Sequence, residues 1–351
     1  EYKDTKINLI DTPGYAAFVS HARPALRVAD CALVVVDGVH GIEVQTEKTW
    51  SYANEFLLPR FMVINKLDKE HSDFGHALET ASSSFARSIV PFTLPIGSEA
   101  NFKGVVDVVH QKAYEFDERG VAKEIPLPEA GRDVFERTRE RLIELVAESD
   151  DALMEKYFND GTLPEEDIYP NLAKAIAKSK LCPVYAVSST NLVGLQILLD
   201  HIVEFAPNPA THEAEYGFAD NDMTGERVSR KYSNDEPFSA YVFCTIADPF
   251  AGRINVMKVV SGKVASDATV LNSTRDMQER LGALHVISGK VLDKVPEAAT
   301  GDIIAVVKLK DTQTGDTLCE KSKPIVYPKV EYPEAAIAFA IEPKPRADED
   351  K

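Results

Sequence analysis

Two short polar motifs, each placed after an apolar run, carry side chains suited to binding a phosphorylated ligand. The first is Asp11-Thr12-Pro13-Gly14, which follows the apolar run KINLI at 6–10. A carboxylate at Asp11 could hold a Mg²⁺ ion through water, and Gly14 could bring its backbone N–H close to a terminal phosphate because no Cβ intervenes. Taken alone, the motif fits a turn that caps the next helix equally well.

The second motif is Asn65-Lys66-Leu67-Asp68, directly after the apolar run RFMVI at 60–64. Guanine presents acceptors at O6 and N7 and N–H donors at N1 and N2, so an amide at Asn65 and a carboxylate at Asp68 match its two edges. Adenine would leave the carboxylate unpaired, which makes the discrimination large. The aliphatic stem of Lys66 can cover the base.

A third element, Val187-Ser188-Ser189-Thr190, follows a later apolar run and is placed for backbone contact with the base oxygen. A chance N-K-x-D in a solvated loop is common, so the second motif alone is weak. The ordered combination of all three elements favours a guanine-nucleotide domain over unrelated loops.

Charge and composition narrow the class of protein. The 351 residues are 44% hydrophobic and carry a formal net charge of -17, so we expect two or three folded domains and no electrostatic binding of nucleic acid by the whole chain. Any RNA contact must be local, and no DNA or membrane partner is indicated. The cysteines form no C-x-x-C pair, which favours a reducing cytoplasm; they are Cys31, Cys182, Cys244 and Cys319.

The elements that must position these motifs alternate along the first part of the chain. Apolar strands are predicted at 6–10, 32–37 and 60–64, with helical patterns near 25–27 and 44–56. Continuous apolar strands separated by helices indicate a parallel sheet covered on both faces. The fold class is therefore α/β, a doubly wound domain of the kind in which ligands bind at the carboxyl ends of the strands.

The pattern then changes and later returns. An alternating strand pattern and a long charged helix from about Gly131 to Val146 suggest an α+β insertion over 97–180. An apolar run typical of a buried strand occurs again at 182–189, so the α/β domain is predicted to comprise 1–96 and 181–206.

Three further segments are predicted after the α/β domain. Polar residues 207–236 are predicted to contain the linker, and short strands with turn signals over 237–330 indicate an antiparallel β-barrel. The last residues, 331–351, include AAIAFAIEP at 335–343, which is predicted to begin a further domain.

At these residues the chain resembles bacterial elongation factor G, a translational GTPase. ALRVADCALVVVDGVHGIEVQTEKTW at 25–50, GVVDVVHQKAYEF at 104–116 and the stretch 248–319, with DPFAGRINVMKVVSGKV, LNSTR and LKDTQTGDTLC, carry the resemblance over essentially the whole chain. It implies a cytoplasmic, monomeric enzyme that hydrolyses GTP on the ribosome to drive translocation, with rRNA and stalk proteins as partners. It also implies GTP or GDP with Mg²⁺ as ligands, Asp11 as the metal residue, and binding residues Asp11, Thr12, Pro13, Gly14, Asn65, Lys66, Asp68, Ser188 and Ser189.

One departure from the family pattern concerns the phosphate-cradling loop. No G-x-x-x-x-G-K-[ST] occurs in the 351 residues, and the upstream threonine loop is also absent. By the resemblance both precede residue 1, so the chain is expected to be a central piece of a longer protein. Losing three charge-assisted hydrogen bonds removes about 5 to 9 kcal/mol of binding free energy. We therefore expect this chain alone not to bind or hydrolyse GTP detectably.

The second departure is Tyr15, where the family usually has a histidine that positions the attacking water. A phenol can donate and accept hydrogen bonds, but it does not supply a positive charge at neutral pH. Tyr15 is thus predicted to orient water, the alternative being simple packing against the next helix. Hydrolysis could therefore be slower or differently triggered, and a ribosome-binding module with little hydrolysis is the alternative function. A tyrosine at this position resembles the divergent second paralogues of the family.

Two basic regions have both a structural and a functional interpretation. The arginines of the 131–146 helix are expected to form local ion pairs on a solvated face, or to dock on the ribosomal stalk. Five cations of the barrel could contact rRNA phosphates or simply lie on a charged surface; they are Arg253, Lys258, Lys263, Arg275 and Arg280.

Overall fold

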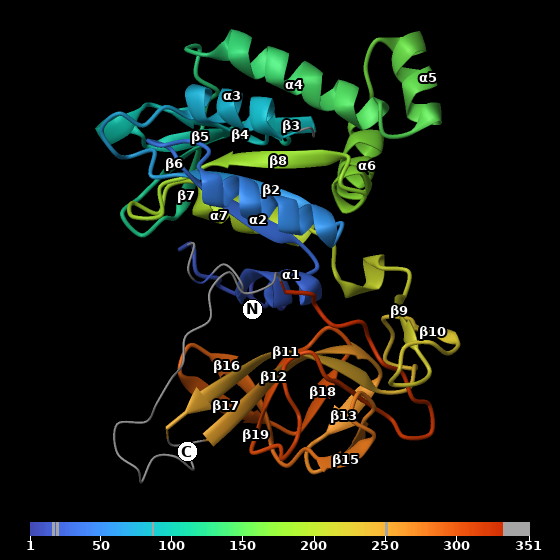
Figure 1. Ribbon diagram of the computed structural model, residues 1–351. Helices are drawn as coiled ribbons and strands as arrows, with labels where there is room; N and C mark the ends of the chain where they lie inside the picture. The colour runs from blue at the N-terminus through green and yellow to red at the C-terminus, as the bar shows by residue number, and fades with distance from the viewer. Residues whose placement is uncertain (16–17, 19–20, 86–87, 250–251, 333–351) are drawn as a thin grey trace.

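The computed structural model describes residues 1–15, 18, 21–85, 88–249 and 252–332. Figure 1 shows an α/β domain above a β domain, with the N-terminal segment between them. In the described part of the chain, no helix is both long and apolar enough to span a membrane. The strand predicted at 335–343 lies outside the described residues.

A parallel sheet forms the centre of the α/β domain, in the order β1-β2-β8-β3. Its strands are β1 (Ala32–Asp37), β2 (Arg60–Asn65), β8 (Leu181–Ala186) and β3 (Ser88–Pro91). Adjacent strands run parallel throughout, and every residue of β8 is buried. Burial on both faces explains why the central strands β2 and β8 are continuous apolar runs, whereas the edge strand β1 leaves Leu33 and Val35 exposed. The predicted α/β fold class is confirmed.

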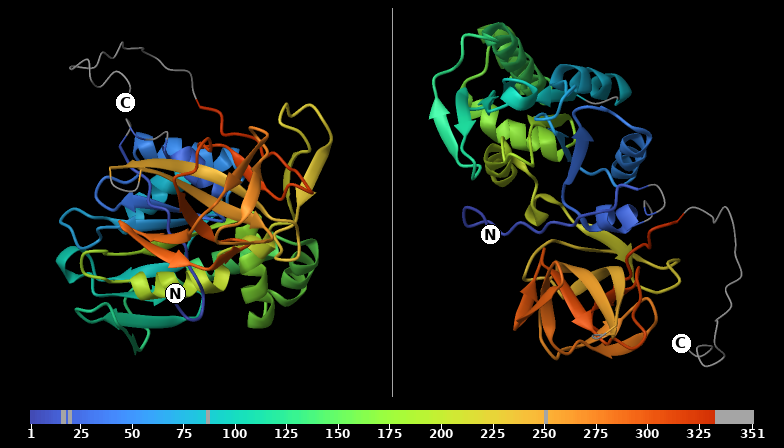
Figure 2. Two further views of the ribbon diagram at one scale, coloured as in Figure 1. Left: turned by 90° about the horizontal axis from the view of Figure 1, so that it is seen from below. Right: turned by 90° about the vertical axis from the view of Figure 1, so that its left-hand side faces the viewer.

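Helices cover both faces of this sheet (Figures 1 and 2). On one face an apolar cluster includes Trp50, which stacks on Phe85, together with residues of α2 and α3. On the other face a second cluster collects apolar residues of α4, α6 and α7. The helices are α1 (Ala22–Val28), α2 (Val44–Glu55), α3 (Phe74–Ser84), α4 (Arg132–Ala147), α5 (Asp151–Asp160), α6 (Glu165–Ala177) and α7 (Leu195–Phe205).

An antiparallel sheet in the order β4-β5-β6-β7 lies largely in the predicted insertion, although its first strand precedes the predicted start at residue 97. Its strands are β4 (Thr93–Ile96), β5 (Gly104–Asp107), β6 (Lys112–Phe116) and β7 (Ala122–Ile125), and a short 3-10 helix lies at Glu99–Asn101. The sheet packs against the same apolar cluster as α2 and α3, so the insertion shares a core with the parallel sheet.

Helix α4 bears out the predicted local ion pairs, with one exception. Arg137 pairs with Asp133, and Arg141 lies 3.0 Å from Glu144. Arg139 instead is buried and donates to the backbone oxygens of Val108 and Val109. The prediction of a solvated side chain is wrong for Arg139, because the turn after β5 offers its guanidinium otherwise unpaired carbonyl groups.

The β domain is an antiparallel sheet in the order β15-β14-β20-β11-β12-β19-β16-β17, joined by the pair β13-β18. It surrounds an apolar cluster that includes Val242, Met257 and Leu318. Its strands are β11 (Ser239–Asp248), β12 (Gly252–Ser261), β13 (Lys263–Ala265), β14 (Thr269–Asn272), β15 (Met277–Arg280), β16 (Leu284–Ser288), β17 (Val291–Val295), β18 (Glu297–Ala299), β19 (Ile303–Val307) and β20 (Thr317–Cys319).

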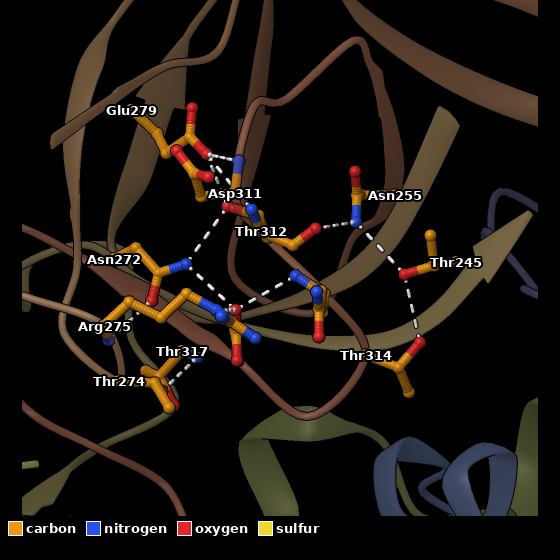
Figure 3. A network of polar contacts seen from close by, with 12 residues as sticks. Thr245, Asn255, Asn272, Thr274, Arg275, Glu279, Asp311, Thr312, Thr314 and Thr317 are labelled. Atoms are coloured by element: carbon orange, nitrogen blue, oxygen red, sulfur yellow. Dashed lines mark hydrogen bonds and ion pairs between the residues drawn. The ribbon is translucent and has the colours of Figure 1, made fainter. Parts of the chain in front are cut away.

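A buried polar network fixes the loop between β19 and β20 (Figure 3). Glu279 accepts from the backbone N–H of Asp311 at 2.9 Å and from the Thr312 hydroxyl at 3.0 Å. Asp316, fully buried, accepts from Asn272 at 3.1 Å and from Arg275 at 2.6 Å. Because Arg275 and Asp316 form an ion pair inside this network, Arg275 has a structural role besides any surface role.

Part of the predicted linker is folded. A 3-10 helix at Pro209–Thr211 precedes a hairpin of β9 (Glu215–Phe218) and β10 (Arg227–Arg230). Glu215 accepts from Arg27 of α1 and from the Tyr232 hydroxyl. The backbone of Phe218 also pairs with that of Val326, which follows β20 of the β domain. The 207–236 region is therefore tied to both domains, a role that polar composition alone did not predict.

Lys258 of β12 also joins the two domains. Its Nζ lies 2.8 Å from the Val28 oxygen and 2.6 Å from Asp30 Oδ1, and its side chain is buried. The expectation that Lys258 could contact rRNA phosphates is wrong, because the carboxylate and carbonyl groups at the end of α1 take up its ammonium group.

The strand predicted at 6–10 is absent. These residues are extended, but they pair with no strand of either sheet, and Leu9 is 80% exposed. Their contacts are with the β domain instead, since Ile10 packs on a cluster that includes β-domain residues and Lys6 pairs with Asp302. An extended segment becomes a strand only where another strand satisfies its backbone groups, and no described strand lies beside this one.

Candidate functional site

Asn65 joins the two loops that follow β2 and β8. Its Nδ2 donates to Ser189 Oγ at 3.0 Å, and its Oδ1 accepts from the backbone N–H of Ser189 at 2.9 Å. Both loops lie at the carboxyl edge of neighbouring parallel strands, which is why residues so distant in sequence meet. The structure thus brings together the second and third motifs.

Asp68 is held in the same corner. Its Oδ1 accepts from Ser188 Oγ at 2.6 Å, its Oδ2 lies 3.3 Å from Lys69 Nζ, and its side chain is only 7% exposed. Burial alone would raise the pKa of this carboxyl group, but the Ser188 hydroxyl and the Lys69 ammonium group lower it overall. Asp68 therefore keeps a negative charge at the edge of the sheet, ready to accept N–H donors.

Lys66 lies between these two residues with an unusual backbone. Its φ of +64° is in the left-handed region, which a residue other than glycine seldom adopts. Its Nζ donates to Asp37 Oδ2 at 2.6 Å, and its side chain is about half exposed. The stem of Lys66 is therefore stretched across the corner rather than buried in a core.

Asp37, which ends β1, and Gly38, which follows it, were not predicted as site residues. Burial would raise the pKa of Asp37, but hydrogen bonds from Lys66 and the backbone N–H of Val39 bring it to about 2. Gly38 donates its N–H to the backbone oxygen of Asn65 at 2.8 Å. A Cβ added to Gly38 would lie 2.8 Å from the same backbone oxygen. The sequence feature that could have predicted these two residues as part of the site is an Asp-Gly pair directly after an apolar run.

The Asp11–Gly14 segment is separate from this corner. Asp11, Pro13 and Gly14 are exposed, a Cβ added to Gly14 would meet no atom within 4 Å, and Tyr15 is 80% exposed. Within the described ranges, no hydrogen bond or ion pair joins this segment to 65–68. The structure therefore assembles the predicted base end of the site and leaves the predicted phosphate end apart.

The base end and the phosphate end of the predicted site differ in the ligands that their side chains can bind. The corner offers a carboxylate, an amide and an extended lysine stem, a donor and acceptor set that suits a guanine base. Asp11 is not part of any group of three metal-ligating side chains in the described part of the chain. A single exposed carboxylate fits binding of Mg²⁺ through water, with water and phosphate oxygens as the other ligands.

Comparison with known proteins agrees with this architecture. The family model "Elongation factor Tu GTP binding domain" matches residues 1–208, and "Elongation factor G domain 2" matches 237–321. A solved crystal structure of a Thermus thermophilus protein, described as ttk003000868, is similar with 31% sequence identity and a TM-score of 0.82. The similarity covers 97% of this chain and 48% of that one, so the chain spans about half the length of that protein. With more than half of its residues matched by the GTP-binding model and its β domain by the second, the chain belongs to the translational GTPases of the elongation factor G type.

Proposed function

We propose that this chain contributes the guanine-binding corner of a GTPase that acts on the ribosome and drives translocation. The observation that carries the proposal is the unit formed by Asn65 with Ser189 and Asp68 with Ser188. A buried carboxylate and an oriented amide on one sheet edge match guanine and not adenine.

Each residue of the corner has a distinct role in this proposal. The Asp68 carboxylate accepts hydrogen bonds from guanine N1 and N2, and the Asn65 amide faces the O6 and N7 edge. The backbone of Ser188 and Ser189 contacts O6, and the Lys66 stem covers one face of the base. The left-handed backbone at Lys66 supports this role, since strain of this kind is concentrated at ligand sites.

The phosphate end of the site is proposed from the family alone. Asp11 would hold Mg²⁺ through water, Thr12 and Pro13 would shape the turn, and the Gly14 N–H would face the terminal phosphate. Tyr15 would orient the attacking water, a role that depends on position more than on basicity. The exposure of Tyr15 supports its availability and does not fit the alternative of a packed side chain.

These 351 residues contain no phosphate-cradling loop, so the chain alone is expected to bind nucleotide only weakly. Without about 5 to 9 kcal/mol of phosphate binding, micromolar affinity falls to the millimolar range or weaker. We propose that hydrolysis belongs to the whole factor, in the cytoplasm, with rRNA and stalk proteins as partners.

Multiple-turnover GTP hydrolysis by the whole factor, with and without ribosomes, tests this function. The proposal predicts that ribosomes stimulate hydrolysis, and that calorimetry finds no tight GDP binding by the 351-residue chain. Binding to ribosomes without stimulated hydrolysis would instead support the ribosome-binding module. Tight GDP binding by this chain would contradict the proposed division of the site.

A further inference from the structure

A cluster of metal-ligating side chains lies away from the guanine-binding corner, where the insertion meets α7. Asp107 ends β5, His110 lies in the turn before β6, and His201 lies on α7. Asp107 and His201 are buried and His110 is partly exposed. No step of the proposed function uses these residues, and their spacing in the sequence gives no metal motif.

The three donor atoms converge on one point. His110 Nδ1 lies 2.8 Å from Asp107 Oδ2, and His201 Nε2 lies 3.2 Å from the same oxygen. The two nitrogens are 3.3 Å apart. Metal–ligand bonds of about 2.1 Å place neighbouring donors about 3.0 to 3.4 Å apart in octahedral or tetrahedral geometry. The observed triangle therefore already has nearly the dimensions of one face of a metal site.

The carboxylate of Asp107 is held so that one oxygen remains for the cluster. Its Oδ1 accepts from the backbone N–H groups of Val109 at 2.9 Å and His110 at 3.0 Å. Oδ2 then faces both imidazoles and no other described donor. A carboxylate fixed by backbone amides is a ligand that need not reorganise when a cation binds.

Glu204 supplies the partner that metal-ligating histidines usually have. Its carboxylate lies 3.2 Å from His110 Nε2, on the side of the ring opposite the cluster. An N–H donated from Nε2 to Glu204 leaves the lone pair of Nδ1 directed toward Asp107. Carboxylate–histidine–metal arrangements of this kind orient the ring and increase its basicity.

His201 is held by aromatic packing rather than by a second polar partner. Its ring makes edge contacts with Phe92, Tyr185 and Phe205, and the residue is 1% exposed. Its Nδ1 is buried without a hydrogen bond. Without a cation, Nε2 donates its proton to Asp107 Oδ2; because Nδ1 has no partner, the proton can occupy Nδ1 when a cation takes the Nε2 lone pair. A buried, unpaired polar atom in a cluster of this kind calls for an explanation.

We propose that Asp107, His110 and His201 bind one divalent transition-metal ion, zinc being the ion that best fits two imidazoles and a carboxylate. Three protein ligands beside a partly exposed histidine leave a fourth position for water. The ion would clamp the turn between β5 and β6 to α7, and so fasten the insertion to the parallel-sheet domain. It takes no part in nucleotide chemistry.

Calorimetry of the metal-free chain with zinc, and with magnesium as a comparison, tests the site. The expected result is one zinc ion per chain, a higher thermal midpoint with zinc, and no binding of magnesium at the same concentrations. Cobalt(II) should give the visible absorption of a low-symmetry site without a thiolate charge-transfer band, which separates this cluster from the cysteines.

Variants identify the ligands. His201→Gln and His110→Ala should each weaken zinc binding by more than about 100-fold, and Glu204→Gln by about 10- to 100-fold. His76→Ala, at an exposed position on α3, should leave zinc affinity unchanged. Circular dichroism of each metal-free variant separates loss of a ligand from loss of fold.

Two results would overturn the proposal. One is a folded wild-type chain that binds no zinc, which would make the cluster a set of hydrogen bonds only. The other is zinc binding that His201→Gln and His110→Ala leave intact, which would place the ion elsewhere. If both ligand variants fail to fold, Glu204→Gln decides, since unchanged affinity in that variant would also contradict the proposal.

Discussion

The corner at 65–68 and the segment at 11–14 carry motifs of similar length, but among the residues that the structure describes only the corner is held in place by hydrogen bonds to a neighbouring loop. In the corner, hydrogen bonds join Asn65 to Ser189 and Asp68 to Ser188 across two strand ends. The Asp11–Gly14 segment follows no paired strand and is largely exposed. A motif is thus positioned by the strands beside it, and residue type alone does not create a site.

The first prediction concerns the base end of the comparison and has the largest expected effect. In the whole factor, Asp68→Asn should reverse the preference for guanine over xanthine, because an amide can donate to the oxygen that replaces the guanine amino group. We expect the affinity for GDP to fall about 1,000-fold or more. Competition between GDP and xanthosine diphosphate measures the change, and an unchanged preference for GDP would remove Asp68 from the base site.

A pair of glycine variants compares the two regions by stability. In Gly38→Ala, the new Cβ would lie 2.8 Å from the backbone oxygen of Asn65 and 2.9 Å from Leu67 Cδ2, so the corner must shift. We expect a loss of about 1 to 3 kcal/mol in the free energy of unfolding. Gly14→Ala is the matched control, with open space around it, and should stay within about 0.5 kcal/mol of wild type. Urea denaturation that gave equal losses would mean that both turns are equally packed.

A third prediction concerns Tyr15 at the phosphate end. Because the side chain is 80% exposed, Tyr15→Phe should leave the free energy of unfolding unchanged. If the phenol orients water, ribosome-stimulated hydrolysis by the whole factor should slow by roughly tenfold. Equal turnover of Tyr15→Phe and wild type would assign the water-orienting role to another group.

The smallest effect is expected in the pH dependence of the corner. The pKa of Asp37 is about 2 in the folded chain, below the ordinary value of about 3.9. The charged carboxylate therefore adds stability above about pH 4, and this contribution is lost as the pH falls toward 2. Lys66→Met removes the main partner and should reduce the loss between these pH values. Acid titrations of the two proteins, followed by circular dichroism, check this, and parallel curves would contradict it.

Much of the α/β domain could be predicted from the sequence because its strands are continuous apolar runs, and the central strands β2 and β8 are buried on both faces. The apolar runs at 32–37 and 60–64 are strands in the structure, and their ends carry Asp37 and Asn65. The run at 6–10 also contains three apolar residues but forms no strand, since pairing depends on a neighbour that periodicity cannot reveal.

Other features depend on contacts between distant residues and could not be predicted. The ion pair of Lys258 with Asp30 and the approach of His201 to Asp107 join positions that no sequence spacing relates. The hairpin in the predicted linker is held by Glu215, which meets Arg27 and Tyr232 only after folding. Charge patterns showed which residues were polar, but not which of them would be buried in pairs.

The central claim is that the corner formed by 65–68 and 188–189 recognises guanine, and nuclear magnetic resonance of this chain tests it most directly. The chain alone should bind too weakly for calorimetry, but millimolar GMP should still shift the backbone signals of Lys66, Asp68 and Ser189, because chemical shifts report binding in the millimolar range. AMP at equal concentration should not shift them. Signals of the 11–14 segment should remain still in both titrations. Equal shifts with GMP and AMP, or shifts confined to other surfaces, would contradict the claim.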